Sequence, residues 1–294
     1  MIMFDKDYIE YQNIKLGFGS FKHPPVLIGT MFYQGQRLIE RSDITKFNKE
    51  KALKKIEKQV QLSEQYKIPA LIEISADTPD AMISYLEFYF ENFKPPFVLG
   101  GTLDARIAGV SYLYEHGYKS EDFIYNAISN LKNQKEIELF KKYEIQTTII
   151  LILAAPNMTS TQRFSYITDK NQPNNLSLFD GLKKLGVKHI WVDGGVVNLE
   201  SLVHILETQK IISTALKVPV GTAPNLFLFK YSSPRLNLKF HTRYRRASIM
   251  FMASWYSNFI FYGPIEDATE CFASTAQSFE FKKLCEEKNV KLWN

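Results

Sequence analysis

The chain has 294 residues, 45% of them hydrophobic, 14% aromatic and 23% charged, which is typical of a folded globular protein and excludes a disordered one. The net charge of +5 favours acidic partners only weakly, and nucleic-acid binding would require more than one basic patch and a recognisable binding module. Two cysteines, and five histidines without metal-ligand spacing, predict neither a disulfide framework nor a protein-bound metal. The longest apolar run, Thr147–Ala155, is much shorter than the roughly 20 residues of a membrane helix. We therefore expect a cytoplasmic protein without a membrane span of its own.

The first element that the sequence predicts is a small β-hairpin over Tyr8–Phe18, where apolar and polar residues alternate. Beyond it, short apolar runs recur, each separated from the next by a stretch long enough for an amphipathic helix. The runs that we predict as strands are Val26–Phe32, Ala70–Ser75, Phe97–Leu99, Phe123–Ala127, Thr147–Leu153, His189–Val192, Val218–Gly221 and Phe259–Phe261.

Helix signals fill the intervals between these runs. In Lys49–Tyr66, the apolar residues Leu53, Ile56 and Val60 fall on one helical face, as a helix that covers a sheet requires. The tripeptide Asp77-Thr78-Pro79 supplies a helix cap and a proline for the first turn of the following helix.

Strands that alternate with helices predict a parallel α/β sheet. Eight such units in a chain of this length favour a closed (β/α)8 TIM barrel, with a doubly wound open sheet as the alternative. No linker interrupts the pattern, so we expect a single domain over 1–294, with a hairpin over 1–20 and the barrel over 21–294. The stretch Asn157–Asn175, rich in Thr, Ser, Asn and Gln, is expected to be a mobile loop over the barrel mouth.

Functional residues of such barrels lie at the C-terminal ends of the strands. Asn126 and Asp193 stand inside otherwise apolar runs, where an unpaired polar group costs about 1–3 kcal/mol, so each either contacts a ligand or holds a neighbouring loop. Asn225 after Pro224 is equally well explained as a helix cap, and Asp77 is better explained as one. The polar side chains that we expect around the mouth include Gln36, Glu73, Thr102, Asn126, Asp193 and Asn225.

Two glycine pairs follow predicted strands, Gly100-Gly101 and Gly194-Gly195. They either let a flat ligand approach the backbone or form tight turns, and neither fits a phosphate-binding motif. A basic stretch, Arg235–Arg246, contains no carboxylate and is either a solvated helix face or a contact with an anion or a partner.

Seven stretches match a known family in the same order along nearly the whole chain: Val26–Gly35, Phe47–Ala52, Thr78–Ala81, Asp104–Gly109, Tyr125–Ile128, Pro219–Gly221 and Tyr262–Ala268. Together they resemble the pterin-dependent methyltransferases, and most closely the family of the H subunit of tetrahydromethanopterin S-methyltransferase.

The resemblance implies a barrel that binds methyl-tetrahydromethanopterin, or a folate relative, and passes its N5 methyl to the Co(I) of a corrinoid carried by a partner protein. It implies that Asp193 and Asn126 face the pterin as catalytic residues, with Asn225 at or next to another such position. It further implies partner methyltransferase subunits, a homodimer, and peripheral attachment to a membrane complex through those partners.

Departures from the family pattern gather at the predicted mouth. Gly100 stands where the family carries a carboxylate, a loss that costs about 1.5–3 kcal/mol if that group bound the pterin. Gln36 replaces a histidine, and Glu73 stands where the family tends to have Asp or another polar residue. Two alternatives follow: a different methyl donor, with Arg245 or Arg246 binding an acidic group, or a non-catalytic binding or scaffold paralogue.

Overall fold

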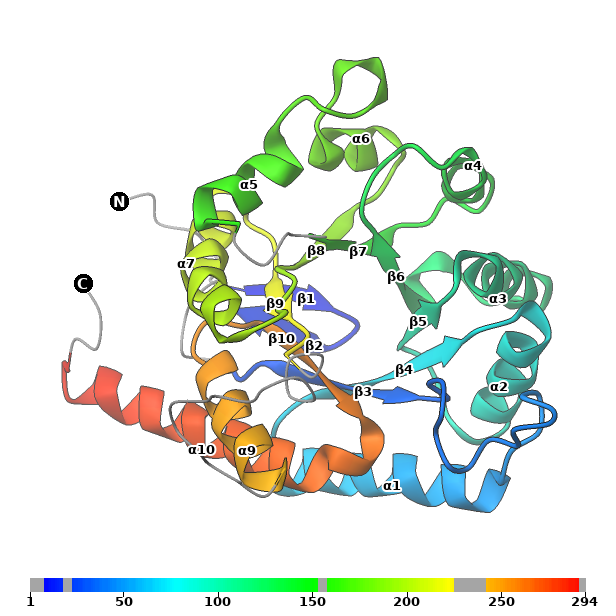
Figure 1. Cartoon of the computed structure of the whole chain (residues 1–294), viewed down its shortest axis with the longest axis horizontal. Coiled ribbons are helices and arrows are strands. Elements are labelled where there is room, and N and C mark those ends of the chain that lie inside the picture. The colour runs from blue at the N-terminus through cyan, green and yellow to red at the C-terminus, as the bar shows by residue number, and fades with distance from the viewer. Residues whose placement is uncertain (1–7, 18–22, 153–157, 225–241, 291–294) are drawn as a thin grey trace.

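The computed structural model describes residues 8–17, 23–152, 158–224 and 242–290. Eight parallel strands close into a barrel in the order β10-β3-β4-β5-β6-β7-β8-β9, and helices surround it (Figure 1). The TIM barrel prediction is confirmed, and closure through the β10–β3 pairing excludes the open sheet. The barrel strands are β3 Val26–Met31, β4 Ala70–Ala76, β5 Phe97–Gly101, β6 Phe123–Ile128, β7 Thr147–Leu151, β8 His189–Asp193, β9 Val220–Thr222 and β10 Phe259–Pro264.

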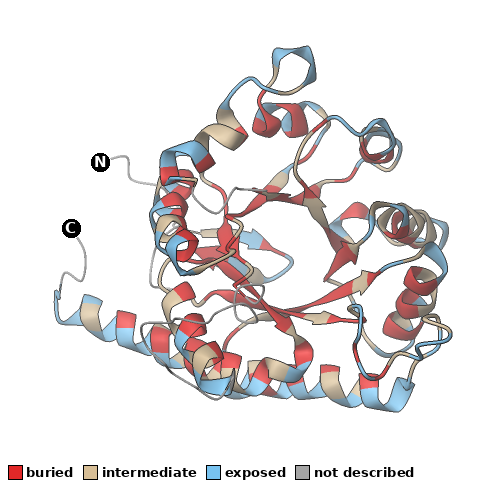
Figure 2. Cartoon of the chain, viewed as in Figure 1, coloured by how far each residue is buried: buried red, intermediate tan, exposed pale blue. Residues whose placement is uncertain are grey.

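Helices connect each strand to the next and bury their inner faces against the sheet, while their outer faces are exposed (Figure 2). The helices that the structure describes are α1 Lys49–Tyr66, α2 Pro79–Asn92, α3 Leu103–Glu115, α4 Gln134–Lys142, α5 Ser160–Thr168, α6 Leu178–Lys184, α7 Leu199–Leu216, α9 Thr242–Ala253 and α10 Ala268–Glu287, with short 3-10 turns η1 Ser120–Asp122, η2 Pro173–Asn175 and η3 Ile265–Asp267.

The predicted N-terminal hairpin is also confirmed, as β1 Tyr8–Tyr11 paired with β2 Ile14–Gly17. Tyr11 is buried, and its ring centre lies 5.9 Å from that of Trp191 inside the barrel. At the other end of the hairpin, Asn258, which directly precedes β10, donates a hydrogen bond to the carbonyl of Gly17. These contacts are with the N-terminal part of the strands, so the hairpin covers that end of the barrel and leaves the C-terminal end as the mouth.

The buried face of α1 differs from the predicted one. Val60 is 44% exposed, and Gln59 beside it is 2% exposed. The polar Gln59 is tolerated inside because its amide donates to the carbonyl of Leu71 at 3.1 Å and accepts from the hydroxyl of Tyr262. A count of apolar residues alone could not find this face.

The expected loop over Asn157–Asn175 is also corrected, because the segment contains α5. Asn157 lies outside the described residues. The Thr159 hydroxyl accepts from the backbone N–H of Gln162, whose side chain in turn accepts from the Thr159 N–H at 2.9 Å. This capping box starts the helix despite its polar composition.

Candidate functional site

Four polar side chains lie in the last interior layer below the barrel mouth. Successive side chains of a strand point to opposite faces, so the residue two positions beyond an interior residue again faces the interior. The interior core contains Ile28, Leu71, Val98, Ile124 and Trp191 on five of the strands. Two positions beyond each of these lie Thr30, Glu73, Gly100, Asn126 and Asp193.

Glu73 on β4 is the centre of this layer. One carboxylate oxygen accepts from the Thr30 hydroxyl at 2.6 Å, and the other accepts from the Asn126 amide at 2.6 Å. Burial raises the pKa of the Glu73 carboxyl, and the two hydrogen bonds and the positive charge of Arg106 act in the opposite direction. The structure thus joins three strands, β3, β4 and β6, through one buried carboxylate.

Gly100 on β5 makes room for this carboxylate. A Cβ at position 100 would overlap Oε1 of Glu73 and lie 3.0 Å from its Cδ. The space that a side chain on β5 would fill is therefore occupied by the longer side chain of Glu73 from β4. Gly100 therefore sits beside a carboxylate that the neighbouring strand supplies.

Asp193 ends β8 and is 4% exposed. Its Oδ1 accepts from the backbone N–H of Gly195 at 2.9 Å. Burial raises the pKa of the Asp193 carboxyl to about 7, and the negative charge of Glu73 adds to the rise, while backbone hydrogen bonds and Arg163 oppose it. Near neutral pH this carboxyl is therefore divided between its two protonation states.

Arg163 on α5 is a neighbour of the site that sequence reasoning missed. It is fully buried, and its guanidinium donates to the carbonyls of Met158, Gly194 and Gly195 at 3.1, 2.5 and 3.2 Å. It thereby fixes the turn that directly follows Asp193. The capping box at the start of α5 was the only sequence signal that could have placed this arginine on a helix.

Arg106 on α3 forms a second buried network beside the layer. Its guanidinium donates to the Gly101 carbonyl at 2.6 Å and pairs with Glu136 at 2.9 Å. The Tyr125 hydroxyl donates to the same oxygen of Glu136 at 2.7 Å. Because Tyr125 directly precedes Asn126, this network anchors the strand that carries the amide.

The other predicted site residues have structural partners. The Gln36 side-chain oxygen accepts from the Phe32 N–H at 2.7 Å, and the side-chain NH2 donates to Glu266 at 3.0 Å. The Thr102 hydroxyl caps α3 and donates to the carbonyl of Asp77 at 3.0 Å. Substrate binding by Thr102 stays a prediction. Asn225 lies outside the described residues.

Two interpretations of the sequence are settled by local geometry. The helix cap of α2 is Thr78 and not Asp77, because the Thr78 hydroxyl accepts from the Ala81 N–H. Gly101 and Gly195 have φ angles of +99° and +72°, and a Cβ at either position would meet a backbone carbonyl. The second glycine of each pair therefore forms a tight turn.

Arg246 does not offer a free guanidinium to a ligand. It is 6% exposed and pairs with Asp267 at 2.6 Å and with Glu270 at 2.9 Å. This corrects the hypothesis that Arg246 binds an acidic group of the donor. Residues 235–241 of the basic stretch lie outside the described residues.

Comparison with known proteins identifies the family. The family model described as "Tetrahydromethanopterin S-methyltransferase MtrH subunit" matches residues 5–290. The chain belongs to the MtrH family. It is a divergent member: it is 27% identical over 288 residues to the MtrH protein of Methanothermobacter thermautotrophicus, covering 95% of this chain and 92% of that one. The MtrH protein of Methanococcus maripaludis is 25% identical over 226 residues, 76% of this chain and 70% of that one.

Solved structures support the fold of this MtrH family member. Dihydropteroate synthase from Xanthomonas albilineans, in complex with 7,8-dihydropteroate, has a TM-score of 0.56 at 11% identity and covers 96% of this chain and 99% of that one. The enzyme from Burkholderia cenocepacia, complexed with the same compound, has a TM-score of 0.57 at 12% identity, covering 94% and 95%. At this identity the likeness concerns the fold alone.

Neither a metal centre nor a membrane helix is found in the described part of the chain. Among the described residues, no three His, Cys, Asp or Glu side chains lie together as a metal ion would require. None of the helices described is both long enough and apolar enough to cross a membrane.

Proposed function

We propose that this chain takes the N5 methyl of a tetrahydromethanopterin- or tetrahydrofolate-type donor and passes it to the Co(I) of a corrinoid carried by a partner protein. The observation that carries the proposal is the layer of Glu73, Asn126 and Asp193, with both carboxylates buried, at the mouth of an MtrH-family barrel. A flat, polar-edged ring requires a pocket with few, well-placed hydrogen-bonding groups, and this layer supplies two carboxylates and an amide.

Asp193 binds the amino-pyrimidinone edge of the pterin in this proposal. That edge presents N–H donors, which favour the ionised carboxylate and so lower the pKa of Asp193 from its value of about 7. Binding of the donor is then linked to loss of a proton. The affinity should rise with pH up to about 7 and become constant above it.

Asn126 serves the reacting N5. Glu73 accepts one N–H of the amide at 2.6 Å and thereby fixes its orientation, leaving the rest of the amide for the substrate. When the N5–CH3 bond breaks, the methyl goes to the acceptor and N5 takes up a proton from water in its place. A hydrogen bond from Asn126 to N5 stabilises the departing amine.

The test is calorimetric titration of the full chain with methyl-tetrahydromethanopterin and with methyl-tetrahydrofolate between pH 6 and 8.5. We expect micromolar binding that weakens below pH 7, and Asp193→Asn should remove both the binding and its pH dependence. Equal binding by wild type and Asp193→Asn would refute the role of Asp193. If wild type binds neither donor, the result would favour a different methyl donor or a scaffold paralogue.

Catalysis is tested separately from binding. Methyl transfer to the reduced corrinoid protein should be lost in Asn126→Ala, while the donor's dissociation constant changes less than threefold. A variant that binds and transfers like wild type would exclude Asn126 as a catalytic residue.

For the proposed homodimer, the supporting observation is a pair of exposed apolar side chains on α10, Phe281 at 44% and Leu284 at 52%. Analytical ultracentrifugation of wild type and of Leu284→Glu measures the dissociation constant of the dimer, which the substitution should raise. A dimer that Leu284→Glu does not weaken would exclude this face as the interface.

A further inference from the structure

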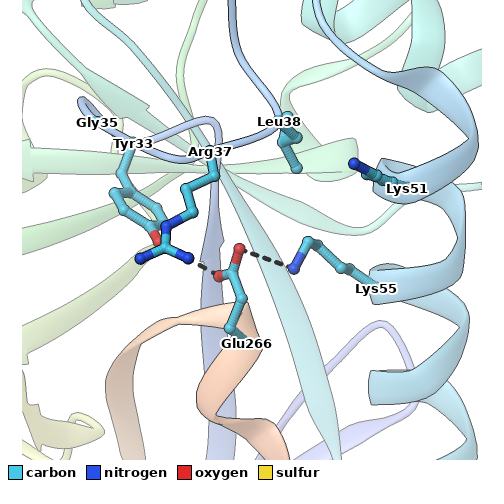
Figure 3. Close-up of a pocket in the computed structure, with 7 residues that line it drawn as sticks. All are labelled: Tyr33, Gly35, Arg37, Leu38, Lys51, Lys55 and Glu266. Atoms are coloured by element: carbon cyan, nitrogen blue, oxygen red, sulfur yellow. Dashed lines mark hydrogen bonds and ion pairs between the residues drawn. The ribbon is translucent and has the colours of Figure 1, made fainter.

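A pocket of about 400 Å³ opens beside the barrel mouth, between the segment after β3, the first half of α1 and the η3 turn after β10 (Figure 3). Tyr33 and Arg37 reach it from the first segment, Lys51 and Lys55 from α1, and Glu266 from η3. The side chains that contribute its charges therefore come from three separate parts of the chain.

The pocket carries an excess of positive charge. Lys55 is paired with Glu266, their nearest atoms lying 2.9 Å apart. Glu266 also accepts from the Gln36 amide at 3.0 Å and from the Tyr33 hydroxyl at 3.4 Å. In the four described stretches, Arg37 and Lys51 form no ion pair with a carboxylate. One acidic group therefore faces three basic ones, two of which are left for a ligand.

This pocket adjoins the layer of Glu73, Asn126 and Asp193. Pro264, two residues before Glu266, pairs in the barrel with Thr30, whose hydroxyl donates to Glu73. The pocket and the layer thus lie at the ends of the adjacent strands β10, β3 and β4. A flat ring seated on Glu73 and Asp193 can extend a flexible chain over the end of β3 toward the basic pocket.

We propose that Arg37 and Lys51 bind an anionic group, phosphate or carboxylate, on the tail of the methyl donor whose ring occupies the barrel mouth. A guanidinium and an ammonium that line one pocket suit the several acceptor oxygens of such a group. Lys55, held by Glu266, keeps a positive charge at the pocket wall. This inference rests on the proposed function for the identity of the donor and on the pocket alone for the anion site.

The first experiment tests the anion site without any pterin. Inorganic phosphate is titrated into the full chain, into the double variant Arg37→Gln/Lys51→Gln, and into Lys54→Gln/Lys58→Gln. The control pair removes the same charge from exposed positions of α1, the helix that carries Lys51. We expect wild type and the control to bind phosphate, with affinity that falls as salt rises, and the double variant to bind at least tenfold more weakly. Equal phosphate binding by all three proteins, or by none, would overturn the anion site.

The second experiment decides whether the anion belongs to the donor or is free phosphate. The same proteins are titrated with methyl-tetrahydromethanopterin and with a 5-methyl-tetrahydropterin that lacks the tail. The double variant should lose about tenfold in affinity for the tailed donor and none for the ring alone. If the affinity for both compounds is unchanged while phosphate binding is lost, the tail assignment is wrong. If wild type binds neither compound, the proposed function fails, and the phosphate titration still decides the pocket.

Discussion

Replacing Asp193 by asparagine should stabilise the protein at alkaline pH, because the fold raises the pKa of this carboxyl from 3.8 to about 7. At about 1.36 kcal/mol per unit, that shift corresponds to at most about 4 kcal/mol. The destabilisation of the wild-type fold by the ionised carboxylate is absent below pH 3.8, grows as pH rises, and is complete above pH 7. Asparagine retains an acceptor for the Gly195 N–H, so the variant loses the charge without losing the hydrogen bond.

Urea unfolding, followed by tryptophan fluorescence between pH 5 and 8.5, measures this difference. The advantage of Asp193→Asn should be largest at pH 8 and decrease steadily toward pH 5. The exposed residue Asp80 provides a charge-matched control as Asp80→Asn. A stability difference that does not vary with pH, or a variant less stable than wild type at pH 8, would refute the reasoning.

Three further predictions concern single side chains. Gly100→Ala should push Glu73 aside and weaken donor binding about tenfold in calorimetry, whereas unchanged binding would show that Glu73 is not needed where it stands. The Lys282 ammonium donates to the Ser254 carbonyl at 2.5 Å, so Lys282→Met should lower the free energy of unfolding in urea by about 1–3 kcal/mol. An unchanged free energy would mean that solvent satisfies that carbonyl. Arg163→Met should cost about 3 kcal/mol in the same assay and also weaken donor binding; loss of stability with intact binding would make Arg163 purely structural.

The fold was predictable because the pattern of the chain is regular. Each predicted strand overlaps an observed one, whereas the cap of α2 is Thr78 and not Asp77, which the sequence favoured. The ends of the strands were less predictable. Strand β5 continues through Gly100 and Gly101, residues with little strand preference, because they pair with Ser75 and Ala76 of β4.

The site was predictable only in part. Asn126, Asp193 and Glu73 stand out because a polar residue at the end of an apolar strand requires a partner. Their relation to one another does not appear in the sequence. The occupation of the space above Gly100 by Glu73 depends on the distance between neighbouring strands. Arg163 reaches the turn after Asp193 from a helix 30 residues earlier in the chain.

The hairpin that covers the N-terminal end of the barrel makes the proton affinity of the site depend on a segment at the opposite end. Tyr11 packs on Trp191, and Trp191 lies one interior position below Asp193. Removal of the hairpin would open a route for water from below to a carboxyl whose pKa is raised mainly by dehydration. We therefore expect the hairpin to act as a seal, so that a chain shortened by it ionises Asp193 at lower pH.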